Sequence, residues 1–470
     1  MDTIQGIRHS AEQFPERTAY KVQDSIVSYR QLWDKAQRYA LLLRKQGNSP
    51  VIVYGHKSTD IVITILACLI AKRPYVPIEE GTPLLRIEKI IGQTEATLLI
   101  TEKPLTTRDI LCLSLSDLER FSDATEFNCE SSIAYIIFTS GSTGEPKGVP
   151  ISRSNLDNFT GWISELATLK EYEGITVFNQ ASFSFDLSVA DLYYSLCNGH
   201  TLLSFGGNIT EDFNGFFNVL KEADVAVMTP SLARLCLVDA SFEHTEFPKL
   251  KCIYFCGERL EVKTVRKLFK AFPDIKIINA YGPTEATSAV SAVEISEEMV
   301  EKELLLSIGR IDTAATGIEI LDGEIVLKGK SVFGGYLGRI TGGFFKESGM
   351  NCYRTGDLGY IKAGYLYCTG RADSQIKFMG YRIELQEIEH HINEMVGVSD
   401  SAVVASYDSN GTVKAIKAYV EADAPLSAED IKRNLAQRIP HYMIPKVIKK
   451  VNSLPLNDNG KVDRKALENL

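Results

Sequence analysis

The chain has 470 residues, of which 44% are hydrophobic and 24% charged, and its formal net charge is −9. This length predicts two or three domains of an ordinary globular protein, and the acidic balance without a basic run excludes the electrostatic footprint of a nucleic-acid-binding protein. The N-terminus has no signal-peptide core, and the longest apolar stretch (61–70) is too short to span a bilayer. We therefore expect a cytoplasmic protein without membrane insertion or a nucleic-acid partner, whose nine scattered cysteines are reduced and mostly buried.

Strand and helix signals alternate through the first hundred residues. Apolar residues recur at helical spacing over 28–46, with Ser28 suited to cap the helix and Gly47 to end it. Further patterns predict strands at 51–54, 75–78 and 96–101 and helices at 58–71 and 84–91. This alternation is typical of a largely parallel α/β sheet.

A glycine-rich segment, Phe138-Thr-Ser-Gly-Ser-Thr-Gly-Glu-Pro-Lys-Gly-Val149, directly follows the apolar strand pattern at 133–137. Its glycines allow a tight turn that exposes backbone N–H groups, and its hydroxyls and lysine add donors and positive charge. Such a loop can hold an oligophosphate through Thr139, Ser140, Gly141, Ser142, Thr143, Gly144 and Lys147. The spacing differs from the Walker pattern because a proline precedes the lysine and a glycine follows it. By composition alone, an ordinary Ser/Gly surface loop is the alternative.

The alternation continues after this loop, with helices predicted at 154–166 and 188–197 and strands at 176–179, 225–228, 253–255 and 277–280. Polar, glycine-bearing segments follow several of the strands, among them 256–258 and 281–285. Ligands of open α/β sheets gather beyond the carboxyl ends of strands, so these segments could converge on one site.

From about residue 304 the pattern changes to short β segments, including a hairpin over 318–327 with an Asp-Gly turn. This indicates a β-rich subdomain packed on the α/β core. A last unit has strands at 375–379, 402–407 and 413–420 and helices at 386–394 and 427–438. We place a domain boundary at Asp373, which gives a large N-terminal domain (1–372) and a small α+β C-terminal domain (373–470).

A series of ordered motifs covers essentially the whole chain. After the glycine-rich loop come Phe185-Asp-Leu-Ser188, Asn279-Ala-Tyr-Gly-Pro-Thr-Glu285, Gly335-Tyr-Leu337, Tyr353-Arg-Thr-Gly-Asp-Leu358, Gly370-Arg-Ala-Asp-Ser-Gln-Ile-Lys377, Gly380-Tyr-Arg-Ile-Glu-Leu385, Tyr442-Met-Ile-Pro445 and Asn459-Gly-Lys-Val-Asp-Arg464. Motif by motif they resemble the adenylate-forming (ANL) superfamily, and within it the amino-acid adenylation domains of nonribosomal peptide synthesis.

Other segments are similar to one subgroup of that superfamily, the D-alanine:carrier-protein ligases. They are Val53-Tyr-Gly-His-Lys57, Phe185-Asp-Leu-Ser-Val189, Thr229-Pro-Ser231, Phe255-Cys-Gly-Glu258 and Glu387-Ile-Glu-His-His391. Lys72, Arg73, Ala190 and Met379 depart from the usual pattern of the subgroup. The resemblance implies a ligase that joins an amino acid to AMP, releases pyrophosphate, and then transfers the aminoacyl group to the phosphopantetheine thiol of a carrier protein.

The resemblance also implies ATP and Mg²⁺ as cofactors and assigns residues to them. The loop from Thr139 to Lys147 is implied to hold the β and γ phosphates, Thr284 to contact the α phosphate, and Glu285 to bind Mg²⁺. The implied nucleoside contacts are Tyr281 stacked on adenine, Gly257 and Glu258 in the same slot, and Asp357 and Arg371 on the ribose.

Lys461 is implied to be the catalytic lysine, which bridges the substrate carboxylate and the phosphate oxygens as charge shifts between them. Its Asn-Gly-Lys context predicts a loop tip that presents the side chain. From the residues alone the bland alternatives are a solvated Lys461, a turn-capping Asp357 and a surface charge at Arg371.

Asp186 is expected to pair with the α-ammonium of the substrate, because a buried carboxylate beside an apolar pocket needs a cation. Helix capping near Ser188 is a competing role for it. The residues implied to surround the substrate side chain are mostly small or apolar: Leu187, Ala190, Val227, Tyr254, Cys256, Ala280, Ser288 and Ala289. They predict a small uncharged amino acid, alanine first and serine, glycine or valine next, with Cys256 as a packing wall and not a nucleophile.

For the second half-reaction the resemblance implies that the C-terminal domain swings about Asp373 and brings 380–384 to the site. No carrier domain follows residue 470, so we expect the carrier to be a separate protein. Two alternatives remain at this stage: an acyl- or aryl-acid:CoA ligase on the same fold, disfavoured by Asp186, and a non-catalytic adenylate-binding homologue.

Overall fold

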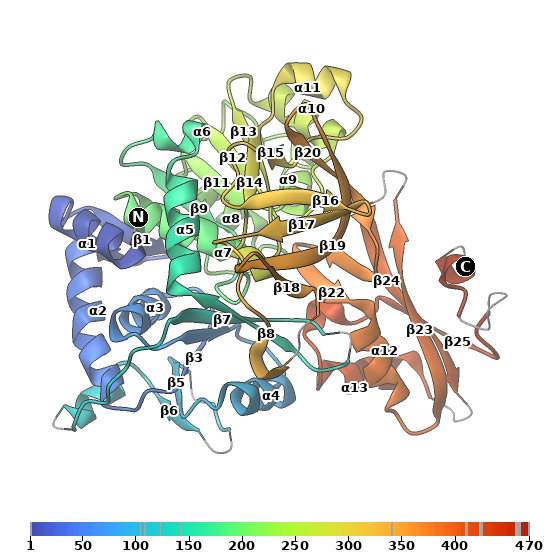
Figure 1. Cartoon of the computed structure of the whole chain (residues 1–470), viewed down its shortest axis with the longest axis horizontal. Coiled ribbons are helices and arrows are strands. Elements are labelled where there is room, and N and C mark those ends of the chain that lie inside the picture. Colours follow the sequence, from blue (N-terminus) through green and yellow to red (C-terminus); the bar gives the residue numbers. More distant parts are fainter. Residues whose placement is uncertain are drawn as a thin grey trace. The chain divides into compact units, whose positions relative to one another are not determined.

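The computed structural model describes residues 2–103, 105–107, 110–122, 124–141, 143–339, 342–408, 412–422, 426–455 and 462–468 (Figure 1). It consists of two compact units, each built from three segments. The first unit comprises Met1–Glu80, Thr94–Ile137 and Val149–Ala372, and the second comprises Gly81–Gln93, Phe138–Gly148 and Asp373–Leu470.

An eight-stranded sheet in the order β14-β13-β12-β11-β9-β10-β1-β2 forms one layer of the first unit. The strands from β13 to β1 run parallel to their neighbours, whereas β14 and β2 are antiparallel at the edges. Their bounds are β1 Thr18–Val22, β2 Ser25–Ser28, β9 Thr176–Asn179, β10 Thr201–Ser204, β11 Val225–Met228, β12 Cys252–Phe255, β13 Lys276–Tyr281 and β14 Ser291–Glu294. The predicted, largely parallel α/β sheet is confirmed.

A second, six-stranded sheet in the order β6-β5-β3-β4-β7-β8 forms another layer. Its strands from β6 to β7 are parallel to their neighbours. Their bounds are β3 Val51–Tyr54, β4 Tyr75–Ile78, β5 Leu98–Thr101, β6 Leu111–Leu113, β7 Ile133–Thr139 and β8 Lys147–Ser152.

Alternate residues of the strands reach opposite cores, as the two-residue repeat of a strand requires. Val225 and Val227 of β11 join a core that also holds Val51 and Val53 of β3, so one apolar cluster connects the two sheets. Ala226 and Met228 belong to a second cluster on the other face of the eight-stranded sheet. Because both faces are covered, the strands read in sequence as continuous apolar runs.

Helices of the first unit supply the rest of these cores. α2 begins at the predicted cap Ser28, whose side chain and that of Gln31 form a reciprocal capping box, and α3 begins after Ser58. The helices are α1 Thr3–Gln13, α2 Tyr29–Arg44, α3 Thr59–Ala71, α5 Arg153–Ser164, α6 Ala167–Lys170, α7 Leu187–Cys197, α8 Phe213–Leu220, α9 Pro230–Cys236, α10 Val262–Ala271 and α11 Glu297–Lys302, with short 3-10 turns at Ser116–Phe121, Thr284–Ala286 and Leu337–Arg339. In the described part of the chain no helix combines the length and apolar character needed to cross a membrane.

The β-rich subdomain predicted after residue 304 is also confirmed. Its strands lie in the order β15-β20-β19-β17-β16, with β18 paired to β19. The predicted hairpin turn places Asp322 at φ 51° and Gly323 at φ 80°, two left-handed residues that match the twist of the flanking strands. The strand bounds are β15 Gly309–Arg310, β16 Gly317–Leu321, β17 Glu324–Lys328, β18 Phe344–Glu347, β19 Met350–Lys362 and β20 Tyr365–Arg371.

The second unit is a small α+β body with its own core, formed by residues such as Ile376, Ile388, Val403 and Leu435. A two-stranded β21–β22 hairpin leads into α12, and a three-stranded sheet β23-β24-β25 follows. Its elements are α4 Leu84–Thr94, β21 Gln375–Phe378, β22 Tyr381–Glu384, α12 Leu385–Asn393, β23 Val398–Tyr407, β24 Val413–Ala422, α13 Ala428–Ala436, a 3-10 turn at His441–Met443, β25 Val447–Val451 and α14 Arg464–Glu468.

The compact units differ from the sequence division in one respect. The last segment of the second unit begins at Asp373, but 81–93 and the glycine-rich loop, both in the predicted N-terminal domain, also cluster with it. Helix α1 was not predicted because small residues, Thr3, Gly6 and Ser10, make up much of its buried face. All nine thiols are free and all but Cys112 and Cys368 are buried, in agreement with the expectation of reduced, packed cysteines.

Candidate functional site

Four neighbouring parallel strands, β9, β11, β12 and β13, end at the same edge of the eight-stranded sheet. The segments that follow three of them are 180–186, 256–258 and 282–285. They carry six of the residues predicted to bind substrate, metal or nucleotide: Asp186, Cys256, Gly257, Glu258, Thr284 and Glu285. Parallel neighbours place their carboxyl ends side by side, so the sheet itself assembles these segments.

Asp186 lies at the start of α7 and is 9% exposed. Although it occupies the N-cap position, its side chain makes no capping hydrogen bond, so the capping role considered from the sequence is wrong for the carboxylate. Its Oδ2 instead accepts a hydrogen bond of 2.6 Å from Thr284 Oγ1. Asp186, predicted to bind the substrate ammonium, is therefore hydrogen bonded to Thr284, predicted to contact the α phosphate.

The turn after β13 is tightly folded. A Cβ on Gly282 would lie 2.5 Å from the Cα of Ala289, so only glycine fits there. Thr287 and Ser288 both have left-handed backbones, at φ 63° and 68°, which is an outlier for a β-branched residue such as threonine. Thr287 Oγ1 holds the turn by donating to the carbonyl oxygen of Ser331 at 3.0 Å. Backbone strain of this kind concentrates at functional sites.

Glu285 is fully buried within this turn. The Tyr336 hydroxyl donates a hydrogen bond to its Oε1 and lies 3.3 Å from the Tyr353 hydroxyl. A buried carboxylate is costly unless a cation or several donors stabilise it. Its oxygen chemistry fits a hard cation such as Mg²⁺.

Asp357 joins two other predicted nucleoside contacts. Its Oδ2 accepts from the Tyr281 hydroxyl at 2.7 Å, and its Oδ1 accepts from Arg371 Nη1 at 2.7 Å. Burial, and next the charge of Asp357, raise the pKa of Tyr281 well above its usual value, so the phenol stays protonated and remains a donor. Gly257 has a φ of 90°, and Glu258 accepts from the backbone N–H of Ser231 at 2.9 Å.

The residues predicted to surround the substrate side chain are brought together by the fold. Val227 and Tyr254 are direct partners on neighbouring strands. Within the core that connects the two sheets lie Leu187, Ala190, Val227, Tyr254, Cys256, Ala280 and Ala289. Ser288 is also buried, and its carbonyl oxygen lies 3.9 Å from Cys256 Sγ.

Two hydroxyls in this group, Tyr254 OH and Ser288 Oγ, are buried without a hydrogen-bond partner among the described residues. An unpaired buried hydroxyl is destabilising, so each such group calls for an explanation.

The glycine-rich loop belongs to the second unit. Thr139 ends β7, Ser140 and Gly144 are buried, Thr143 is exposed, and Lys147 begins β8. A Cβ on Gly141 would lie 2.0 Å from the carbonyl oxygen of Glu145, so the turn requires glycine. Ser142 and the predicted catalytic Lys461 lie outside the described residues. Asp373 begins the last segment, and its Oδ1 accepts from the Gln375 N–H at 3.2 Å.

Sequence reasoning missed two features of the first unit. Tyr336, the partner of Glu285, stands in the quoted motif Gly335-Tyr-Leu337, but nothing in the spacing pairs it with a carboxylate 51 residues away. Lys57 donates to the carbonyl oxygens of Asn179 and Gln180, at 3.1 and 2.7 Å, directly before the Asp186 segment. Burial lowers the pKa of Lys57 to about 8.

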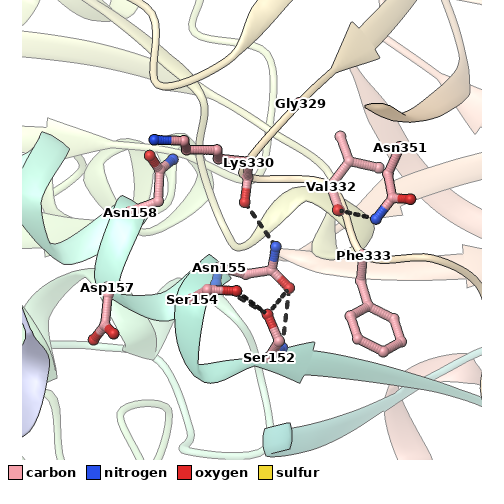
Figure 2. Close-up of a pocket in the computed structure, with 10 residues that line it drawn as sticks. All are labelled: Ser152, Ser154, Asn155, Asp157, Asn158, Gly329, Lys330, Val332, Phe333 and Asn351. Atoms are coloured by element: carbon pink, nitrogen blue, oxygen red, sulfur yellow. Dashed lines mark hydrogen bonds between the residues drawn. The ribbon is translucent and has the colours of Figure 1, made fainter. Parts of the chain in front are cut away.

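A separate hollow of about 580 Å³ lies between α5 and the loop before β18, and Figure 2 shows its lining. Its polar side chains serve local structure: Ser152 and Asn155 form the capping box of α5, and Asn351 donates to the carbonyl oxygen of Val332. None of the predicted site residues lines it, so it is not the candidate site.

Comparisons with known proteins show which family the chain belongs to. Residues 7–337 match the AMP-binding enzyme family, and residues 387–461 match the AMP-binding enzyme C-terminal domain. A D-alanine–D-alanyl carrier protein ligase of Bacillus licheniformis is 36% identical over 500 aligned positions, which cover 100% of this chain and 99% of the relative.

Solved structures share the fold over almost the whole chain. The Vibrio cholerae adenylation domain AlmE, in complex with glycyl-adenosine-5′-phosphate, has a TM-score of 0.85 at 23% identity and covers 100% of this chain and 97% of its own. Holo-PA1221, which contains adenylation and PCP domains, has a TM-score of 0.84 at 25% identity, with 99% and 84% covered. The chain belongs to the AMP-binding enzyme family and is an adenylate-forming ligase.

Proposed function

We propose that this ligase activates a small uncharged amino acid, alanine first, as aminoacyl-AMP and then transfers it to the phosphopantetheine thiol of a separate carrier protein. The observation that carries the proposal is the buried Asp186 carboxylate, which directly precedes Leu187 and the apolar core that also holds Ala190 and Val227. A substrate without an amine would bring no positive charge to that carboxylate. The name of the Bacillus licheniformis relative supports the same substrate and carrier.

In the first step a substrate carboxylate oxygen attacks the α phosphorus of ATP, the α–β phosphoanhydride bond breaks, and pyrophosphate leaves. Asp186 would hold the α-ammonium and Thr284 the α phosphate, an arrangement supported by their mutual hydrogen bond. Glu285 would hold Mg²⁺, which neutralises phosphate charge. Tyr281, Asp357 and Arg371 would hold the nucleoside.

In the second step the carrier thiol, after loss of its proton, attacks the aminoacyl carbonyl, and AMP leaves as the thioester forms. We assign Lys461 to the first step only, with Asp373 as the hinge that separates the two steps and 380–384 as the segment that faces the thiol. Ordered domain movement of this kind is a common way to time successive reactions.

The test is amino-acid-dependent ATP–pyrophosphate exchange with D- and L-alanine, glycine, serine and valine, followed by mass spectrometry of a phosphopantetheinylated carrier. Propionate, which is alanine without its amine, is the matched control. We expect alanine to exceed propionate by about 30-fold or more, because a desolvated charge pair contributes at least about 2 kcal/mol. Faster turnover of propionate with coenzyme A would identify an acyl:CoA ligase instead, and absence of exchange with every acid would identify a non-catalytic homologue.

A further inference from the structure

Within the second unit, β22 and the start of α12 form hydrogen bonds with the Ser140 hydroxyl and the Gly141 backbone N–H of the glycine-rich loop. The Ser140 hydroxyl donates to the carbonyl oxygen of Arg382 and accepts from the backbone N–H of Glu384, both at 2.9 Å. The backbone N–H of Gly141 donates to Glu387 Oε2 at 2.8 Å. A backbone amide and a hydroxyl of the loop are therefore already engaged within the chain.

Glu387 is fully buried, and its other oxygen, Oε1, accepts from Arg86 Nη1 at 2.6 Å. The Arg86 side chain is 6% exposed. A buried ion pair repays its desolvation only when further hydrogen bonds satisfy the remaining lone pairs, and the Gly141 N–H supplies one. Arg86 thus fixes a carboxylate against the loop.

The lysine of the loop has an acidic neighbour from the same segment. Lys147 Nζ lies 3.6 Å from Glu384 Oε1, and both side chains are largely buried. A Cβ on Gly144 would lie 1.9 Å from Cδ2 of His390, so the imidazole ring of His390 on α12 packs directly on the loop backbone. The amide, the hydroxyl and the ammonium of the loop each have a partner between Arg382 and Glu387.

These are the donor types that make a glycine-rich loop a phosphate site. A carboxylate oxygen is an anionic acceptor of the same kind as a phosphate oxygen, and hydrogen bonds from N–H groups to either are charge-assisted. The backbone N–H of Gly141 cannot make a full hydrogen bond to the Glu387 carboxylate and to a phosphate oxygen at the same time.

We propose that the Glu387 carboxylate, held by Arg86, occupies the phosphate-binding position of the glycine-rich loop whenever no nucleotide phosphate is bound there. Glu387 and the β and γ phosphates of ATP then compete for Gly141, while Glu384 competes for Lys147. This inference rests on the proposed function, because it takes the loop to be the site of those phosphates.

The competition orders the two half-reactions. ATP must displace the 382–387 segment in order to bind, and that segment regains the loop only after pyrophosphate has left. Pyrophosphate release thereby allows the loop to dock on α12. The thioester step then takes place with the phosphate-binding position already free of phosphate.

The experiment measures pyrophosphate affinity in full-length protein by isothermal titration calorimetry with Mg²⁺-pyrophosphate as the probe. Glu387→Gln keeps the shape and an acceptor but removes the charge, so we expect it to bind pyrophosphate about 5-fold or more tightly than wild type, since a charge-assisted hydrogen bond is roughly twice as strong as a neutral one. Glu429→Gln is the matched control: it removes the same charge from an exposed position of α13 and should leave the affinity unchanged.

A second measurement uses the wild-type protein and does not depend on the variant folding. The Glu384 N–H is hydrogen bonded to Ser140, so hydrogen exchange over 382–388 should be slow without ligand and faster once pyrophosphate is bound. Two results would overturn this inference and leave the proposed function standing. One is hydrogen exchange over 382–388 that stays slow with pyrophosphate bound, in an enzyme with normal ATP–pyrophosphate exchange activity. The other is equal pyrophosphate affinity of Glu387→Gln and wild type. A wild-type protein that binds neither ATP nor pyrophosphate would overturn the proposed function and the inference with it.

Discussion

Thr284 Oγ1 and Asp186 Oδ2 lie 2.6 Å apart, although 98 residues separate them in the chain. The hydrogen bond fixes one carboxylate oxygen at the end of β13 while the backbone of Asp186 starts α7. In the proposed function Thr284 holds the α phosphate and Asp186 holds the substrate ammonium, so this contact would set the spacing between the two substrates.

Asp186→Ala should abolish amino-acid-dependent ATP–pyrophosphate exchange, because the substrate ammonium loses a partner that contributes roughly 2–5 kcal/mol to binding. Asp186→Asn is the informative companion, since its amide oxygen can still accept from Thr284. We expect the Asn variant to keep the thermal stability of wild type and to lose activity almost as fully as the Ala variant. Wild-type exchange in either variant would remove Asp186 from the substrate site.

Asp357→Ala should raise the KM for ATP by roughly 10- to 150-fold and leave the KM for the amino acid nearly unchanged, since hydrogen bonds to charged groups contribute about 1.5–3 kcal/mol. Tyr281→Phe keeps the ring and removes only the donor to Asp357, so its effect on the KM for ATP should be several-fold smaller. Steady-state kinetics with ATP and the amino acid varied in turn measures the two KM values separately. A larger change in the amino-acid KM would place Asp357 elsewhere in the mechanism.

Tyr336→Phe should increase the Mg²⁺ concentration needed for half-maximal exchange by about 10-fold or more, because groups that orient a metal ligand typically contribute a factor of 10–100 to affinity. The phenol donates to Glu285 Oε1, so the variant removes this hydrogen bond and keeps the carboxylate. Tyr360→Phe, on the exposed side of β19, is the control and should titrate with Mg²⁺ as wild type does.

Tyr254→Phe tests whether the unpaired Tyr254 hydroxyl serves the substrate. Removing a buried hydroxyl that has no partner is nearly neutral or stabilising, so the melting temperature should hold or rise, and alanine-dependent exchange should stay within about twofold. In Tyr194→Phe the lost hydroxyl donates to the Leu169 carbonyl oxygen at 2.7 Å, and that variant should be destabilised by about 1 kcal/mol. A selective loss of serine-dependent exchange in Tyr254→Phe would point to serine as the substrate.

Acidification should destabilise the first unit through His200. Burial, and next the charge of Arg17, lower the pKa of this imidazole to about 4 from 6.5. Between those pH values the unfolded chain binds a proton that the folded chain does not, so the free energy of unfolding is fully retained above pH 6.5 and decreases towards pH 4, by about 3 kcal/mol. Urea unfolding of wild type and His200→Phe at pH 7 and pH 4.5 measures the difference.

In His200→Phe this part of the pH dependence should vanish, because the phenyl ring keeps the packing against Tyr194 without a titrating group. His9→Gln, at an exposed position of α1, should keep the pH dependence of wild type. Equal slopes in all three proteins would show that His200 does not bind its proton differently in the folded state.

Local pattern predicted the layers of the fold because each parallel strand is buried on both faces and each long helix has a recognisable cap, as at Ser28 and Ser58. The order of motifs likewise predicted the composition of the candidate site, and the parallel register of β11 and β12 explains why Val227 meets Tyr254.

What the sequence could not supply were pairings across long distances. Tyr336 with Glu285 and Arg86 with Glu387 are ordinary residues in their local context, and only tertiary packing turns them into buried partners. The periodicity of apolar residues predicts which face of a helix or strand is buried, but it does not predict which distant polar side chains pair there.

The closed turn from Gly282 to Ala289 limits how this pocket can diversify. Gly282 lies against Ala289, with two consecutive left-handed residues between them, so we expect the turn not to accommodate an inserted or deleted residue. The turn also carries Glu285, proposed to hold the metal, and Ser288, proposed to contact the substrate side chain. If the proposed site is right, new substrate preferences should arise through single side-chain exchanges on the strands beside the turn, such as Val227 of β11. Replacing the turn with one of different length should instead impair the proposed metal binding and the substrate selectivity together.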